Sequence, residues 1–357
     1  MELQVVARFV IGLGLLVLGA GWLVRGAASL ARAAGVSSLV VGLTVVAFGT
    51  SAPEMAVSVK AAWAGQADMA VGNVVGSNLF NVLFILGASA LLTPLVVSQP
   101  LVRRDVPLLI VASIVVFFLA TDGGISRLEG VGLLAVLVVY TVWLIRSSRA
   151  AGAAADEAAP DAGPRRLWLE VVLLLAGLGL LVLGSQWMVE GAVAFARTLG
   201  VSEVVVSLTI VAAGTSLPEV ATSLLAASRG ERDIAVGNVV GSNLFNLLGV
   251  LGLAGAVSPT ELPVSAAMVR FDLPVMIAAA FACLPLFARG HVIPRWEGAL
   301  LFAAYLAYTL FLVLDATGHQ AKSGYVWAML HLVAPLTAVT LVVIAIQVRR
   351  GPASAAP

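Results

Sequence analysis

Two glutamates occupy places where an unpaired acid is costly. Glu54 lies near the middle of the apolar run 38–64, and Glu219 lies near the middle of the apolar run 203–229. A carboxylate without a partner at that depth in a bilayer costs about 2.5 kcal/mol or more, so each acid needs a compensating positive charge. Lys60 is the only nearby base. It lies six residues from Glu54 and therefore on a different face of the expected helix. We therefore expect a bound cation to supply the charge.

Each glutamate ends a short sequence that is rich in oxygen ligands. GTSAPE begins at Gly49 and GTSLPE begins at Gly214. The proline before each glutamate removes a backbone N–H and opens the preceding turn, which frees carbonyls around 47–50 and 212–215. Hard cations bind carboxylates, carbonyls and hydroxyls, and these sequences supply all three. The hydroxyl residues one turn before the two acids are Thr50, Ser51, Thr215 and Ser216.

A second motif, GNVVGSNLFN, follows each of these sequences in the next apolar run. Ser77 and Asn81 are four residues apart and share one helical face, as do Ser242 and Asn246. These side chains are neutral oxygen ligands near mid-membrane, or alternatively hydrogen-bonding groups between helices. Their recurrence beside both glutamates favours a role as ligands.

The chain contains the same unit twice. The offset between the motifs above is 165 positions, as from Gly49 to Gly214, and it grows to 168 by the match of Ile125 with Ile293. We expect five helices in each copy and one further helix at the end. The expected spans are 5–33, 38–64, 69–92, 104–121 and 126–146, then 168–198, 203–229, 234–257, 269–288 and 293–314, and last 325–348. The corresponding regions are a first repeat (1–146), a cytoplasmic linker (147–167), a second repeat (168–314) and an extra helix with a cytoplasmic tail (315–357).

An odd number of helices per copy turns the second copy upside down in the membrane, an arrangement that many secondary transporters share. The predicted fold is therefore an all-α polytopic membrane protein with two inverted five-helix repeats, which form ten core transmembrane helices, plus one extra C-terminal transmembrane helix. The composition agrees, because 61% of the residues are hydrophobic and only 11% are charged. A net charge of +1 gives no sign of a nucleic-acid partner.

The basic residues predict an orientation in the cell membrane. With the N-terminus outside, most of the 20 Lys and Arg residues fall on cytoplasmic segments, among them Arg103, Arg104 and Arg149. The C-terminus is then cytoplasmic. The single cysteine, Cys283, lies in an apolar run and is expected to be a buried hydrophobe.

The two motif pairs, GTSAPE with GNVVGSNLFN and GTSLPE with GNVVGSNLFN, resemble the two alpha repeats of the sodium/calcium exchanger family. The resemblance covers roughly residues 5–314 and implies a secondary active antiporter, not an enzyme, that exchanges sodium for calcium by alternating access. These ions and the lipid bilayer are the expected partners, and no cofactor is expected. Residues 5–33 and 168–198 resemble the long paired helices that slide to switch access.

Transferred position by position, the resemblance implies a complete set of ion ligands. The implied calcium ligands are the side chains of Glu54 and Glu219 and the carbonyls of Thr50 and Thr215. The implied sodium ligands are the carbonyls of Ala47 and Ala212 and the hydroxyls of Ser51, Ser216, Ser77 and Ser242. Asn81 and Asn246 are implied to line the middle of the site.

The chain departs from some family members. Where some of them carry aspartate, this chain has Asn246, which leaves two acids at the centre. The second motif lacks the glutamate of the proton-coupled branch, and the long regulatory loop of animal members is missing. The alternatives are antiport with protons, potassium or another divalent ion, a gated cation channel, or a membrane enzyme, for which no nucleophile or metal-binding histidine accompanies the acids.

Overall fold

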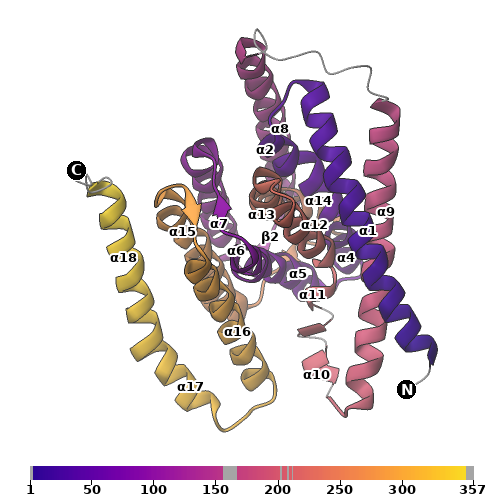
Figure 1. Ribbon diagram of the computed structural model, residues 1–357. Coiled ribbons are helices and arrows are strands. Elements are labelled where there is room, and N and C mark those ends of the chain that lie inside the picture. The colour runs from indigo at the N-terminus through magenta and orange to yellow at the C-terminus, as the bar shows by residue number, and fades with distance from the viewer. Residues whose placement is uncertain (1–2, 156–166, 202, 207–208, 211, 351–357) are drawn as a thin grey trace.

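The computed structural model describes residues 3–155, 167–201, 203–206, 209–210 and 212–350, and nearly all of them are helical (Figure 1). Within these residues, eight helices are long and apolar enough to cross a membrane, or nine if the bent pair Ser38–Thr50 and Ala52–Trp63 forms one span. Two expected spans fall outside that count. In the span 104–121, the apolar helix begins only at Val106, after a π-helical turn that ends in charged residues. The span 203–229 includes positions outside the described residues. The all-α membrane fold is confirmed.

The helices follow the repeat in the sequence, and π-helical turns (η) interrupt several of them. The first copy contains α1 (Leu3–Ala34), α2 (Ser38–Val41), η1 (Gly42–Val46), α3 (Ala47–Thr50), α4 (Ala52–Trp63), α5 (Ala67–Leu79), η2 (Phe80–Ile85), α6 (Leu86–Leu92), η3 (Leu101–Asp105), α7 (Val106–Ala120) and α8 (Arg127–Ala155). The second copy contains α9 (Leu167–Thr198), α10 (Glu203–Val206), α11 (Ala212–Gly214), α12 (Leu217–Ser228), α13 (Arg232–Leu244), η6 (Phe245–Val250), α14 (Leu251–Val257), η7 (Met268–Asp272), α15 (Leu273–Ala288) and α16 (Arg295–Ala316).

The helix α8 is longer than the sequence pattern predicted. It continues from the expected end at 146 as far as Ala155. Alanine is the best helix former, and the residues 150–155 are mainly alanine, so the helix continues beyond the apolar run. The rest of the predicted linker, 156–166, lies outside the described residues.

The long helices α1 and α9 pack against each other in antiparallel directions along one side of the bundle (Figure 1). A Cβ added to Gly19 would lie 2.8 Å from the carbonyl oxygen of Gly177, and one added to Gly12 would lie 2.8 Å from that of Gly184. Rising residue numbers in α1 are paired with falling residue numbers in α9, so the two helices run in opposite directions. Glycine at these positions lets the two backbones approach more closely than any side chain would allow.

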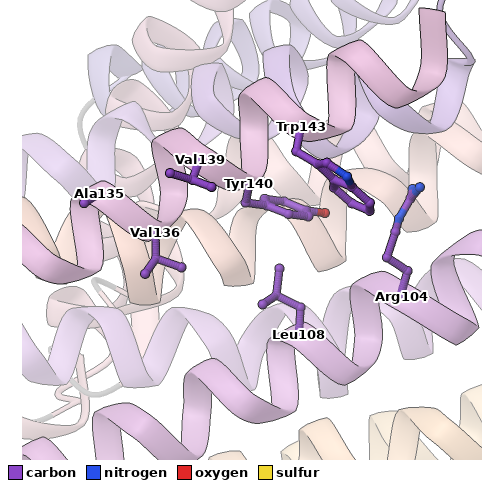
Figure 2. A pocket seen from close by; sticks show the side chains of 7 residues that line it. All are labelled: Arg104, Leu108, Ala135, Val136, Val139, Tyr140 and Trp143. Atoms are coloured by element: carbon purple, nitrogen blue, oxygen red, sulfur yellow. The ribbon is translucent and has the colours of Figure 1, made fainter. Parts of the chain in front are cut away.

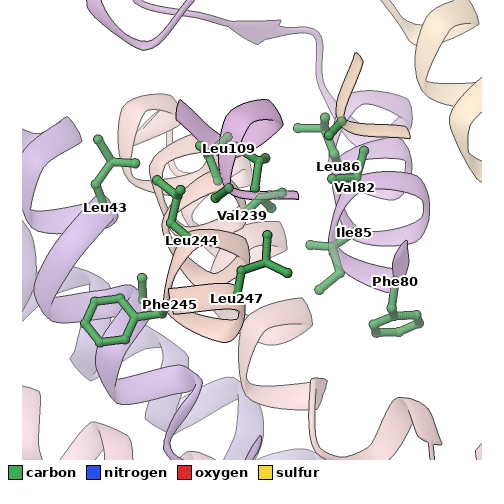
Figure 3. Close-up of a cluster of buried hydrophobic side chains, with 14 of the residues drawn as sticks. Leu43, Phe80, Val82, Ile85, Leu86, Leu109, Val239, Leu244, Phe245 and Leu247 are labelled. Atoms are coloured by element: carbon green, nitrogen blue, oxygen red, sulfur yellow. The ribbon is translucent and has the colours of Figure 1, made fainter. Parts of the chain in front are cut away.

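The helices that carry the second motif lie at the centre of the bundle. The spans Ala67–Leu92 and Arg232–Val257 are the most deeply buried of the eight. Aliphatic side chains from both spans fill the space between them, with Leu244 and Leu247 on one side and Ile85 on the other (Figure 3). The apolar core therefore surrounds the two copies of GNVVGSNLFN.

In the described part of the chain, two short β-ribbons, which the sequence did not predict, join the copies. β1 (Leu95–Val96) pairs with β4 (Val292–Ile293), and β2 (Gly124–Ile125) pairs with β3 (Leu262–Pro263), both antiparallel. Each ribbon joins a strand of one copy to a strand of the other. Pairing satisfies backbone groups in segments that leave the helical structure.

The last helix lies outside the repeat and beside its second copy. It consists of α17 (Lys322–Ala328), η8 (Met329–Val333) and α18 (Ala334–Arg350), and it contacts α15 and α16. The Tyr325 hydroxyl donates to the Ala307 carbonyl at 2.7 Å, and Lys322 forms an ion pair with Asp315. Most of its apolar side chains face outward, as expected for a helix in contact with lipid.

Candidate functional site

Both glutamates stand at the beginning of a half-helix. The helix of the first copy breaks at Ser51, where ψ is 5°, and the axes on either side differ by 47°. In the second copy ψ is 8° at Ser216, the residue before α12. Glu54 and Glu219 therefore lie in the first turn of α4 and of α12, each directly after a proline. A helix N-terminus carries a partial positive charge, which favours an acid in that turn.

Each glutamate is hydrogen-bonded by a serine of the opposite copy. The Ser216 hydroxyl donates to Oε1 of Glu54 at 2.7 Å, and the Ser51 hydroxyl donates to Oε1 of Glu219 at 3.2 Å. All four side chains are fully buried. The two helix breaks therefore meet, and each carboxylate lies beside the serine that precedes the other half-helix.

The serines of the second motif lie in the same polar cluster. The Ser77 hydroxyl lies 3.2 Å from that of Ser216, and the Ser242 hydroxyl lies 3.4 Å from that of Thr50. Both contacts join one copy to the other. The structure thus brings together the serines that the sequence placed one helix away from each acid.

Among the residues that the structure describes, four buried oxygens around the two helix breaks have no hydrogen-bond partner. They are Oε2 of Glu54, Oε2 of Glu219, Oδ1 of Asn81 and Oδ1 of Asn246. Asn81 lies in η2, which packs against α12, and Asn246 lies in η6, which packs against α4. Buried oxygens without a partner carry a desolvation penalty that a bound cation removes. Two carboxylate and two amide oxygens form the all-oxygen set that a hard cation prefers.

The remaining predicted residues lie within one helical turn of Ser51 or Ser216 along the chain. Thr215 donates from its hydroxyl to Oδ1 of Asn73 at 3.4 Å. The Ala47 carbonyl accepts the backbone N–H of Ser51 at 3.0 Å and the Thr50 hydroxyl at 3.4 Å. Ala212 is the first residue of α11.

Two asparagines that the sequence interpretation missed connect the helices around the acids. Nδ2 of Asn73 donates to the Ser58 hydroxyl at 2.9 Å and to the Glu54 carbonyl at 3.3 Å. Asn238 repeats the first contact, with Nδ2 donating to the Ser223 hydroxyl at 3.0 Å, and its Oδ1 accepts the Thr50 hydroxyl at 3.1 Å. Asn73 and Asn238 recur at the same offset as the other repeated residues, and this recurrence could have identified them from the sequence.

Asn78 and Asn243 were also missed. They are the seventh residues of GNVVGSN in the two copies. Nδ2 of Asn81 donates to Oδ1 of Asn243 at 3.0 Å, and Nδ2 of Asn246 donates to Oδ1 of Asn78 at 3.1 Å. Each predicted asparagine is therefore held by an unpredicted one from the other copy.

Other features of the bundle lie apart from this cluster. Across the described part of the chain, no group of three or more His, Cys, Asp or Glu side chains could hold a metal ion, so a cation here must use neutral oxygens as well. An apolar groove of about 520 Å³ lies between α7 and α8, with Arg104 and Trp143 at one end (Figure 2). A second groove of about 440 Å³ lies between α1 and α9 near Phe9 and Phe195.

A sequence profile described as sodium/calcium exchanger protein matches residues 4–146 and 169–314. The chain belongs to the sodium/calcium exchanger family. The chain is 40% identical over 277 residues to "Putative antiporter CaxA" of Alkalimonas amylolytica, a match covering 76% of this chain and 86% of that protein. It is 32% identical over 307 residues to "Sodium/calcium exchanger MaX1" of Methanosarcina acetivorans, covering 76% of this chain and 87% of that protein.

Solved structures give the same result for the fold. The structure of the sodium-calcium exchanger NCX_Mj soaked with Na⁺ and Ca²⁺ matches with a TM-score of 0.74 and 32% sequence identity, covering 86% of this chain and 97% of that one. This chain is therefore a multi-pass membrane protein of a family of cation antiporters. The resemblance inferred from the two motif pairs is confirmed.

Proposed function

We propose that this exchanger-family protein carries calcium in one direction and sodium in the other through the cluster around Glu54 and Glu219. The four buried oxygens without a partner are the observation that supports this proposal. Two of them belong to acids from different copies, so a cation between them would bridge the two halves of the protein. The names of MaX1 and NCX_Mj, which both refer to sodium and calcium, agree with this choice of ions.

The charge of the two acids accounts for the exchange. Two ionised glutamates carry two negative charges, which one calcium ion or two sodium ions would neutralise. Calcium takes six to eight oxygen ligands at about 2.3–2.6 Å, so it would use oxygens that sodium also needs. The two ions would exclude one another from the same ligands. A third sodium on neutral ligands would make each cycle electrogenic, worth about 2.3 kcal/mol per 100 mV for one net charge.

The proposed ligands are the residues of the polar cluster. Calcium would bind the side chains of Glu54 and Glu219 and the carbonyls of Thr50 and Thr215. Sodium would use the carbonyls of Ala47 and Ala212 and the hydroxyls of Ser51, Ser77, Ser216 and Ser242, while Asn81 and Asn246 would line the centre. The serine hydroxyls that now bond to the glutamates would turn their lone pairs to the ion when it binds.

Alternating access would come from two repeats in inverted orientation. The antiparallel packing of α1 on α9 supports this arrangement, because these are the first helices of the two copies. Glycines at the crossing leave the contact free of interlocking side chains, which suits sliding. We propose that the N-terminus lies outside and the C-terminus in the cytoplasm, as the Lys and Arg distribution favours.

Calcium uptake into proteoliposomes tests the proposal. Vesicles loaded with sodium, potassium or protons are diluted into medium that lacks the loaded ion and contains labelled calcium. Sodium-driven exchange predicts uptake only from sodium-loaded vesicles. Uptake driven by potassium or protons instead would change the coupling ion, and uptake without any counter-ion gradient would indicate a channel.

A further inference from the structure

Asn78 and Asn243 lie outside the proposed set of ion ligands, and they bond to each other across the two copies. Nδ2 of Asn78 donates to the backbone carbonyl of Asn243 at 3.4 Å, and Nδ2 of Asn243 donates to the backbone carbonyl of Asn78 at 3.3 Å. Only 1% of Asn78 and 2% of Asn243 is exposed, so water does not compete for these bonds.

The carbonyls determine which way the two amides point. A backbone carbonyl can only accept a hydrogen bond, so it must face the NH₂ end of the amide. For Asn78 a second acceptor lies on the same side, because Sδ of Met276 is 3.7 Å from Nδ2. A half-turn of this amide would place Oδ1 against two acceptors. Its oxygen therefore points the other way.

The same constraint passes to the next amide. Oδ1 of Asn78 accepts from Nδ2 of Asn246 at 3.1 Å, and Oδ1 of Asn243 accepts from Nδ2 of Asn81 at 3.0 Å. An amide oxygen can only accept a hydrogen bond. Asn246 must therefore direct its Nδ2 toward Asn78, and Asn81 must direct its Nδ2 toward Asn243. Their own oxygens then face away, and these are the two amide oxygens without a partner.

The direction of these amides matters to a cation. An amide oxygen is a ligand for a hard cation, whereas the NH₂ end presents positively polarised protons that repel it. We propose that Asn78 and Asn243 are positioning residues that fix the amide direction of Asn246 and Asn81, so that oxygen and not nitrogen faces the transported ion. This inference rests on the proposed function, because it assumes that a cation binds beside Glu54 and Glu219.

A double-mutant design separates this role from a general structural one. Asn78→Leu keeps the approximate size of the side chain and removes its hydrogen bonds. It is introduced into the native chain and into chains carrying Asn246→Ala or Asn246→Asp. Alanine has no amide to orient, and a carboxylate presents an oxygen in either direction. Binding of labelled calcium to purified protein, at fixed sodium concentration, gives the Kd of each variant.

We expect Asn78→Leu to raise the calcium Kd tenfold or more in the native chain, and less than twofold in the Asn246→Ala and Asn246→Asp backgrounds. Residues that act through one another are non-additive in this way. The same fold-change in all three backgrounds would show a general structural role and overturn the inference. An unchanged Kd in the native chain would also overturn it.

The mirrored set gives an independent measurement. Asn243→Leu is combined with Asn81→Ala and with Asn81→Asp, so the inference stays testable if the Asn78→Leu protein does not fold. Glu54→Gln serves as the reference for the proposed function. If Glu54→Gln loses calcium binding while both leucine variants retain the native Kd, the ion site is correct and the positioning role is wrong. If the native protein binds no calcium, both are wrong.

Discussion

The hydroxyl of Ser216 donates to a carboxylate oxygen of Glu54 across 2.7 Å, although 162 residues separate them in the chain. The equivalent pair, Ser51 and Glu219, makes the same contact at 3.2 Å. Each acid is thus held by the helix break of the other copy. A change at either break is expected to act on both halves of the cluster, and the predictions below use that relationship.

Removing the charge of either central acid should abolish exchange. Glu54→Gln and Glu219→Gln keep the size of the side chain but leave one negative charge for a divalent ion. We expect calcium uptake into sodium-loaded proteoliposomes to fall to the level of protein-free vesicles. Glu261→Gln, at an exposed position before β3, is the matched control and should transport normally. Native uptake by either central variant would falsify the assignment of the site.

The serine bonds to the acids should contribute to ion affinity. The two hydroxyls are proposed to offer a lone pair to the ion, so Ser216→Ala or Ser51→Ala removes an oxygen ligand. A polar contact to a charged group is worth about 1.5–3 kcal/mol, so the calcium Kd should rise about tenfold or more. The control is Ser113→Ala, since that buried hydroxyl donates to the Leu109 carbonyl of its own helix. Kd measured with labelled calcium checks the prediction. Equal effects in the control and the two site variants would contradict it.

Cation binding should stabilise the folded protein. A ligand that binds the folded state alone, at 100 times its Kd, stabilises it by about 2.7 kcal/mol. We expect calcium and sodium each to raise the Tm of the protein in detergent. In Glu54→Gln the rise with calcium should be absent or much smaller. Magnesium at the same concentration is a control for ionic effects. A calcium-induced rise as large in Glu54→Gln as in the native chain would place the stabilising ion elsewhere.

The crossing of α1 and α9 should tolerate no added methyl group. In Gly19→Ala the new Cβ would lie 2.8 Å from the Gly177 carbonyl oxygen, which is closer than packed atoms approach. Overpacking of this kind costs about 1–3 kcal/mol, so both Tm and transport rate should fall. Gly14→Ala, on the same helix, has nothing within 4 Å of the added atom and is the matched control. If both variants behave alike, the close packing is unimportant.

Much of the fold could be predicted from local patterns. Apolar runs of membrane length and the offset of the repeat identified most helices, because a helix in lipid must satisfy its backbone within its own segment. Pro53 and Pro218 located both helix breaks, since proline removes the same backbone donor wherever it occurs. The end of α8 and the two β-ribbons were missed. An alanine-rich helix end has no apolar boundary, and a strand of two residues has no periodicity.

The sequence alone placed Glu54 and Glu219 in the membrane and assigned the family, because burial cost and motif identity depend on residue types and their spacing. It could not show that Ser216 bonds to Glu54, or that Asn78 orients Asn246. These contacts join residues more than 160 positions apart. They exist because the packing of the two copies brings four helices to one point, and the direction of each amide there follows from a carbonyl of the opposite copy.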